Sequence, residues 1–158
     1  MPSPARPGFA VLPVPGGPSP AEGDMTTPRD GATRTRGEIE AAVSAGISRF
    51  EQEYLGRGPK DVRAFLLGDL VVVRLQGVLT AAEQHLVKSL SPDKGRDLLK
   101  QVRTQLIEVA RPALMAMIHE ATGASAVSLH HDISTVTGEE IIVVSLASAP
   151  DVREAKKR

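Results

Sequence analysis

Two apolar runs separated by only two residues constrain the fold of this chain more than any other feature. Residues 62–67 and 70–75 are rich in Val, Leu and Phe and flank Gly68-Asp69. A two-residue connection that contains glycine suits the tight turn of an antiparallel hairpin. Such a turn determines the register, so the following pairs should face each other: Leu67 with Leu70, Phe65 with Val72, and Arg63 with Arg74.

Both faces of this hairpin are apolar. Alternate residues of a strand point to opposite sides, and one side suits a covering of helices because it carries Val62, Ala64, Leu66, Val71, Val73 and Leu75. The other side carries Phe65, Leu67, Leu70 and Val72. A sheet with helices on one side normally shows water a polar second face, so this apolar face predicts another chain or a further layer. A helix of the same chain is the alternative, but the available helices are needed on the first face.

Helix signals surround the hairpin. Thr35 with Glu38, and Thr80 with Glu83, have capping-box spacing, and Ser91-Pro92 offers a third helix start. The first helix should bury Ile39, Val43, Ile47, Phe50 and Tyr54 and end at Gly56. The third should run to Gly123, bent at Pro112, and bury Leu98, Val102, Leu106, Val109, Ala113, Met117 and Ala121.

A second hairpin completes the expected order of elements. Residues 127–133 and 141–146 flank Thr137-Gly138 and have the composition of strands. The order helix, hairpin, helix, helix, hairpin predicts an α+β fold, with a four-stranded antiparallel sheet and helices on one face. Because a helix followed by a hairpin occurs twice, the pattern suggests two related halves.

Composition divides the chain into three parts. Residues 1–36 hold eight of the twelve prolines and few large apolar residues, which predicts a disordered Pro/Gly-rich leader. Residues 37–147 have the length of a single domain with its own core. Residues 148–158 lack apolar periodicity and end in a basic cluster, so we expect a flexible basic tail.

Charge and composition exclude several classes of partner. The 19 Lys and Arg residues balance the 19 Asp and Glu residues, and only one Tyr and three Phe are available to stack on bases. Nucleic-acid binding is therefore disfavoured. The absence of cysteine excludes disulfides and Cys-ligated metals and fits a reducing compartment. No apolar stretch approaches the roughly 20 residues of a membrane span, so we expect a cytoplasmic protein without direct membrane insertion.

Four basic residues form a candidate anion site. Arg63 and Arg74, facing each other across the hairpin, would repel unless each is solvated or meets a carboxylate or other anion. Arg57 and Lys60 lie in a glycine-rich turn whose backbone donors could also bind an anion. That turn lacks the ending of a phosphate loop, and the alternative is an ordinary helix stop.

The four histidines do not predict a metal centre. His130 and Asp132 would share one face of a strand while His131 points among apolar neighbours. Two ligands do not make a site, and His85 and His119 stand alone on helices. No arrangement of Ser or Thr with these histidines resembles a catalytic triad. We therefore expect no metal, no cofactor and no catalytic residues, so the chain should not be an enzyme.

Several segments occur together in an order that is similar to a known family. They are Gly56-Arg57-Gly58-Pro59, residues 68–75 from Gly68 to Leu75, Gly77-Val78-Leu79-Thr80-Ala81-Ala82-Glu83, Val102-Arg103 and Thr122-Gly123. Over about residues 36–147 the chain resembles the MpsC-type family, the sodium-translocating membrane potential-generating system component. The resemblance implies an accessory role beside a membrane subunit in cation and inorganic carbon uptake. It carries over no catalytic residues.

These observations lead to one functional hypothesis and one alternative. The hypothesis is a non-catalytic cytoplasmic accessory subunit that acts through protein contacts, forms a homodimer through Phe65, Leu67, Leu70 and Val72, and reaches the membrane through a membrane-embedded transport subunit. The alternative is a stand-alone binder or sensor of small anions that uses Arg57, Lys60, Arg63 and Arg74.

Overall fold

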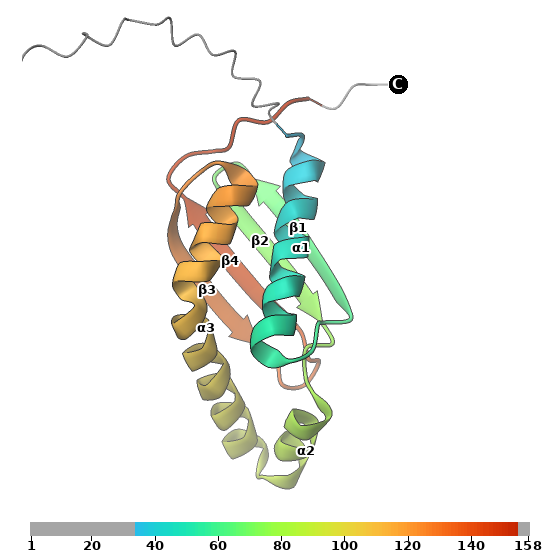
Figure 1. The fold of residues 1–158 in the computed structure, drawn as a ribbon. Coiled ribbons are helices and arrows are strands. Elements are labelled where there is room, and N and C mark those ends of the chain that lie inside the picture. Colours follow the sequence, from blue (N-terminus) through green and yellow to red (C-terminus); the bar gives the residue numbers. More distant parts are fainter. Residues whose placement is uncertain (1–33, 155–158) are drawn as a thin grey trace, which may run out of the picture. The chain divides into compact units, whose positions relative to one another are not determined.

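The computed structural model describes residues 34–154, and this part of the chain forms three helices and a four-stranded antiparallel sheet (Figure 1). The elements in chain order are α1 (Arg36–Leu55), β1 (Asp61–Leu67), β2 (Leu70–Gln76), α2 (Ala81–Ser89), α3 (Pro92–Thr122), β3 (Ala126–Ile133) and β4 (Glu140–Leu146). The predicted α+β class is confirmed. Residues 1–33 of the predicted leader lie outside the described part of the chain.

The sheet joins the two hairpins through their second strands. Its strand order is β1-β2-β4-β3, so β2 and β4 form the centre and β1 and β3 the edges. In the first hairpin Leu67 pairs with Leu70 and Phe65 with Val72, which is the register that the short turn predicts. Gly68 has a φ of 63° in that turn, a backbone conformation that glycine adopts without steric cost.

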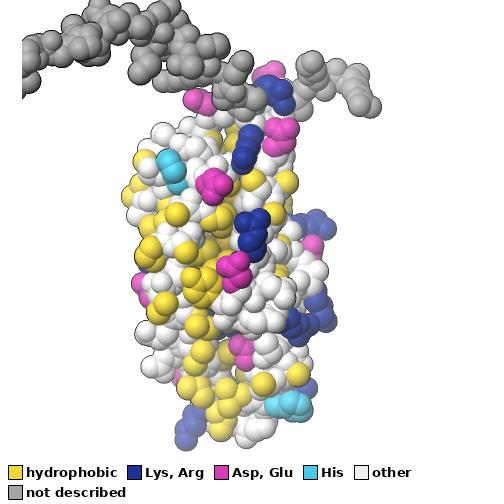
Figure 2. All heavy atoms as spheres, viewed as in Figure 1, with side chains coloured by type: hydrophobic (Ala, Val, Ile, Leu, Met, Phe, Trp, Pro, Cys, Tyr) yellow, Lys and Arg dark blue, Asp and Glu magenta, His cyan; other side chains and the backbone are white. Residues whose placement is uncertain are grey.

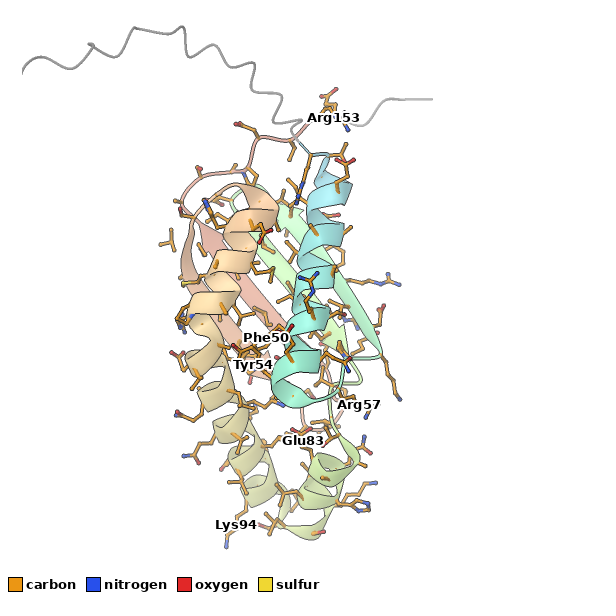
Figure 3. All side chains as sticks on the ribbon, viewed as in Figure 1. Phe50, Tyr54, Arg57, Glu83, Lys94 and Arg153 are labelled. Carbon is orange, nitrogen blue, oxygen red and sulfur yellow. The ribbon has the colours of Figure 1, made fainter. Side chains whose placement is uncertain are left out.

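Helices α1 and α3 lie side by side across one face of the sheet (Figure 1). The core between the helices and the central strands contains Val71, Val73, Leu75, Ile142, Val144 and Leu146 from the sheet. From α1 it contains Ile39, Val43, Ile47 and Phe50, as the helical spacing predicts. Tyr54 was expected in the same stripe but is 43 % exposed, with its ring centre 4.8 Å from that of Phe50 (Figure 3). The core therefore ends one turn before the end of α1.

The buried face of α3 differs from the predicted stripe. The residues that α3 buries are Gly95, Leu99, Arg103, Ile107, Ala110, Leu114, Ile118, Ala121 and Thr122. Of the predicted stripe, Leu98, Val102 and Val109 are 41 %, 47 % and 74 % exposed. Ala121 is buried as predicted, but the prediction was wrong for Leu98, Val102 and Val109. The reason is that α3 carries two neighbouring apolar stripes, and the inner one is interrupted by Arg103. A charged residue at helical spacing reads as the polar face of a helix.

Helix α2 and the start of α3 extend beyond the end of the sheet (Figure 1). No residue of α2 is fully buried, yet the two helices approach each other closely at Gly95. A Cβ atom on Gly95 would lie 3.0 Å from the Cα atom of Val87, so a side chain at this position would push the helices apart. The close crossing therefore depends on glycine.

Both predicted capping boxes are present. In each, the threonine hydroxyl accepts from the backbone N–H of the glutamate three residues later, and the carboxylate accepts from the threonine N–H, for Thr35 with Glu38 and Thr80 with Glu83. Ser91 precedes Pro92 at the start of α3 but makes no capping hydrogen bond with its side chain. Local sequence thus specifies where α1 and α2 begin.

The described part of the predicted tail, residues 148–154, returns to the start of α1. The backbone N–H of Arg153 donates to Arg34 O at 3.1 Å, and its guanidinium lies 3.7 Å from Glu38. Within residues 34–154 none of the helices has the length and apolar character needed to cross a membrane.

Candidate functional site

The face of the sheet opposite α1 and α3, called the outer face here, has an apolar centre. Pairing across the strands places Phe65, Val72 and Val143 in one row and extends it to His130. The neighbouring rows are Leu67, Leu70, Ser145 and Ser128 on one side, and Arg63, Arg74, Ile141 and Asp132 on the other. None of the three described helices covers this face (Figure 1).

Exposure on the outer face is uneven. Phe65 on the edge strand is 40 % exposed and Leu67 is 54 % exposed, whereas Leu70 and Val72 on the central strand are half-buried. Sequence reasoning did not include the contributions of β4, Ile141 and Val143. Their alternation in the second hairpin was readable, but only the pairing of β4 with β2 places them beside Val72 and Arg74.

The four basic residues of the predicted anion site lie in two separate places. Arg63 and Arg74 face each other on the outer face, and each has a carboxylate of its own: Arg63 Nε lies 3.3 Å from Asp61 Oδ2 and Arg74 Nε lies 2.8 Å from Glu139 Oε2. These pairs relieve the repulsion that the sequence implied. The guanidinium of Arg57 instead donates to Leu79 O at 3.3 Å, and Lys60 lines a cavity beside α2.

The histidines of β3 divide between the two faces of the sheet, as the strand alternation predicts. His130 and Asp132 lie on the outer face, and His131 points inward toward Glu140. A hydrogen bond from Lys100 to the Asp132 carboxylate, 2.8 Å long, lowers the pKa of Asp132 below its usual value. In the part of the chain that the structure describes, no group of three His, Asp or Glu residues is placed to hold a metal ion.

A buried charge cluster, centred on Arg103 of α3, joins the helices to the sheet. Its guanidinium lies 3.2 Å from Glu140 of β4, 3.1 Å from Glu83 of α2 and 3.5 Å from Glu51 of α1. It also donates to Val78 O at 2.9 Å. Glu83, at the end of α2 nearest the sheet (Figure 3), serves both the cap of α2 and this cluster. One cation therefore meets three carboxyl groups from three elements.

One carboxyl group of the cluster is held in its protonated form near neutral pH. Burial, together with the charge of the nearby Glu140, raises the pKa of Glu51 to about 8, against the opposing effect of Arg103. A single guanidinium that already faces Glu140 and Glu83 cannot stabilise a third full charge in a desolvated site. We therefore assign the proton of the cluster to the carboxyl group of Glu51. Two atoms of the cluster, Glu51 Oε1 and Arg103 Nε, have no hydrogen-bond partner in the described structure, and His131 Nε2 beside the cluster lies 2.9 Å from Glu140 Oε1.

The cluster connects α1, α2, α3 and β4. Arg103, Glu51 and Glu140 are each almost fully buried, so they are closed to a substrate. Sequence reasoning missed the cluster. The available signal was Arg103 itself, which stands four residues after Leu99 and four before Ile107, in the middle of the stripe that the structure buries.

A second apolar surface lies on the helical side. Hydrophobic side chains follow α3 on the face shown in Figure 2, whereas Lys, Arg, Asp and Glu side chains lie mixed over α1. Leu98, Val102 and Val109 are exposed, and their spacing of four and seven residues puts them in one row along α3. We call this row the α3 stripe. Exposed apolar rows of this kind on a helix are typical of interaction sites.

Comparison with known proteins places the chain in a family. The family model described as Na+-translocating membrane potential-generating system (MpsC) matches residues 35–148. The uncharacterized protein YbcI of Bacillus subtilis (strain 168) is 36 % identical over 115 residues, which cover 73 % of this chain and 90 % of YbcI. The uncharacterized protein YrhF of the same strain is 30 % identical over 101 residues, which cover 63 % of this chain and 78 % of YrhF. No solved structure matches. The chain belongs to the MpsC family.

Proposed function

We propose that this chain is a non-catalytic cytoplasmic accessory subunit that acts through protein contacts. The observation that carries the proposal is the outer face, where Phe65, Leu67, Leu70, Val72, Ile141 and Val143 form an apolar area that no described helix covers. The family description adds a context, because it names a membrane potential-generating system that translocates Na+. An accessory role there is our proposal.

A second copy of the chain is the occupant that we propose for the outer face. A two-fold axis brings the same patch of both copies together, so the apolar centre would bury itself against an identical centre. The rim carries both signs of charge, with Arg63 and Arg74 near Asp61, Glu139 and Asp132. Positive groups of one copy can therefore meet negative groups of the other. Burial of six such side chains is worth several kcal/mol, at ~25 cal/mol per Å2 of apolar surface.

A membrane-embedded subunit is the second partner that we propose, and the α3 stripe is the surface for it. In a dimer formed through the outer faces, the helices of both copies point away from the interface. Leu98, Val102 and Val109 would then stay exposed on the outside of the dimer. The two surfaces thus have separate partners and can be tested separately.

The test uses two matched double variants of the full chain. Phe65→Glu with Val72→Glu places four charges in the two-fold contact, so we expect light scattering to report a monomer with an unchanged helical circular dichroism signal. Leu98→Glu with Val109→Glu changes exposed residues of the α3 stripe. This control variant should remain a dimer but lose co-purification with an integral membrane protein from detergent extracts.

Two outcomes contradict the dimer. A wild-type chain that is monomeric at tens of micromolar concentration would show that the outer face does not join two copies. A dimer that dissociates in the α3-stripe variant, but persists in the outer-face variant, would place the contact on the helices. Equal co-purification of the membrane protein by all three chains would reject the α3 stripe as its binding surface.

A further inference from the structure

A cavity of about 320 Å3 lies between α2, the loop that follows β2 and the turn between β3 and β4. It is lined by Lys60, Gly77, Leu79, Gln84, Val87, Lys88, Thr135, Val136, Thr137 and Gly138. The lining contains two lysines and three side chains that can donate neutral hydrogen bonds, and it contains no Asp or Glu. Its electrostatic character is therefore positive.

The backbone brings Lys60 to this cavity. Its N–H donates to Gln76 O at 2.9 Å, and its aliphatic stem lies against Gly77. A Cβ atom on Gly77 would lie 2.6 Å from the Cγ and Cδ atoms of Lys60, and Gly77 has a φ of 67°. Any other residue would clash with the lysine stem and strain the backbone. The glycine thus allows Lys60 to cross the loop and reach the cavity.

Lys88 approaches the same cavity from the last turn of α2. Neither Lys60 nor Lys88 takes part in an ion pair within residues 34–154, whereas Lys100 is paired with Asp132. Both lysines are exposed residues that line one concave surface on which no carboxylate lies. An anion bound there would meet positive charge without a competing carboxylate.

The rest of the wall suits a ligand with both polar and apolar parts. The backbone N–H of Val78 donates to Gly138 O at 3.2 Å and ties the two loops together. The Thr137 hydroxyl accepts from the N–H of Glu139 at 3.3 Å, which leaves its own hydrogen free to donate. Leu79 and Val87 supply apolar surface, and Val136 at the rim is 93 % exposed. A valine so exposed would gain burial by closing over a ligand.

We propose that this cavity binds a small organic anion, either a phosphate ester or a carboxylate with an apolar body. Lys60 and Lys88 would bind the charged group, Thr137 would donate to it, and Leu79, Val87 and Val136 would contact the apolar part. A volume of about 320 Å3 is at the lower end of ligand sites in proteins and exceeds what an inorganic anion fills. The site does not depend on the proposed dimer, because none of its lining residues is among those that form the outer face or its rim.

The experiment is an NMR titration of the full chain labelled with 15N, using four probes. Phenyl phosphate and benzoate carry the proposed combination of charge and apolar body, inorganic phosphate carries charge alone, and benzyl alcohol carries the body alone. We expect phenyl phosphate to bind most tightly and to shift the amide signals of Gly77, Thr137 and Gly138. Inorganic phosphate and benzyl alcohol should bind more weakly, and added salt should lower the affinity for phenyl phosphate.

Three single variants locate the site. Lys60→Gln and Lys88→Gln should each lower the affinity for phenyl phosphate by about tenfold, because each removes one charge-assisted hydrogen bond. Lys94→Gln is the matched control, since Lys94 is an exposed lysine that does not line the cavity. It lies in the first turn of α3, at the end of this helix away from the sheet (Figure 3). This variant should bind like the wild type.

The proposal is overturned if phenyl phosphate causes no shifts at these amides at millimolar concentration. It is also overturned if Lys94→Gln weakens binding as much as the cavity variants do, because that result would show general attraction of anions to the surface. Equal affinity for phenyl phosphate and inorganic phosphate would reject the apolar contact and with it the organic ligand. Amide spectra of each variant without probe report whether the fold is intact.

Discussion

The guanidinium of Arg103 lies 3.2 Å from the carboxylate of Glu140, and both side chains are within 2 % of complete burial. A buried ion pair adds little to stability compared with an apolar pair of the same size, but removing one partner leaves an uncompensated charge in the core. Arg103 also faces Glu51 and Glu83, so its loss would leave three carboxyl groups around an empty position. The cluster therefore makes the fold sensitive to single substitutions at its centre.

We expect Arg103→Met to lower the free energy of unfolding by about 3–5 kcal/mol, the usual cost of breaking a buried ion pair from one side. Urea denaturation followed by circular dichroism measures this change. Arg96→Met is the matched control on the same helix, because Arg96 is half-exposed and pairs only with surface carboxylates. It should change stability by less than about 0.5 kcal/mol. Equal losses in the two variants would contradict the central role of Arg103.

The protonated state of Glu51 predicts a pH dependence. Its pKa rises from 4.5 to about 8 in the folded protein, so the folded chain keeps a proton that the unfolded chain releases between these values. This contribution to stability is fully present below about pH 4.5 and is lost as the pH rises through about 8. In Glu51→Gln the dependence disappears. The stability of the variant relative to that of the wild type should therefore rise with pH, by up to about 1.4 kcal/mol per pH unit.

Denaturation curves collected from pH 5 to pH 9 measure that difference, and a carbon NMR titration of the Glu51 carboxyl group measures its pKa directly. A stability difference that stays constant over this range would contradict the assignment of the proton to Glu51. So would a carboxyl titration centred near the ordinary value.

The crossing of α2 and α3 predicts opposite results for two glycine substitutions. A Cβ atom on Gly95 would meet backbone atoms of Val87 at 3.0 and 3.2 Å, so Gly95→Ala should destabilise by about 1–3 kcal/mol through overpacking. Gly37 in the first turn of α1 has open space, with only Thr35 Oγ1 at 4.0 Å. Gly37→Ala should be neutral, or stabilise by up to about 1 kcal/mol through helix propensity. Thermal unfolding compares the two, and a stabilising Gly95→Ala would contradict the close crossing.

The capping box of α2 predicts a moderate loss of stability when its threonine is replaced. Thr80→Ala removes the hydroxyl that accepts from the N–H of Glu83, which should lower stability by about 1 kcal/mol. Thr104 is exposed within α3, so Thr104→Ala should be neutral or slightly stabilising. Hydrogen exchange of the first amides of α2 adds a local measurement. If the exchange protection of these amides is unchanged in Thr80→Ala, the buried charge cluster alone holds the start of α2.

Local patterns in the sequence were sufficient for most of the secondary structure. The register of β1 with β2 follows from a two-residue turn, since any other pairing would leave Gly68-Asp69 unable to connect the strands. The starts of α1 and α2 follow from side chains that bond within three residues. The apolar residues of the outer face in the first hairpin were also readable, because a strand alternates its side chains.

Only the tertiary structure decided which stripe of α3 faces the core and how the charged residues combine. The α3 stripe and the buried stripe both have helical spacing, and Arg103 makes the buried one look like the polar side. The core can hold this charge because the carboxyl groups of Glu51, Glu83 and Glu140 converge on it from two other helices and a strand. In the same way, Ile141 and Val143 join the outer face only because β4 pairs with β2. Such long-range pairings are set by the packing of the whole domain, so the local sequence does not specify them.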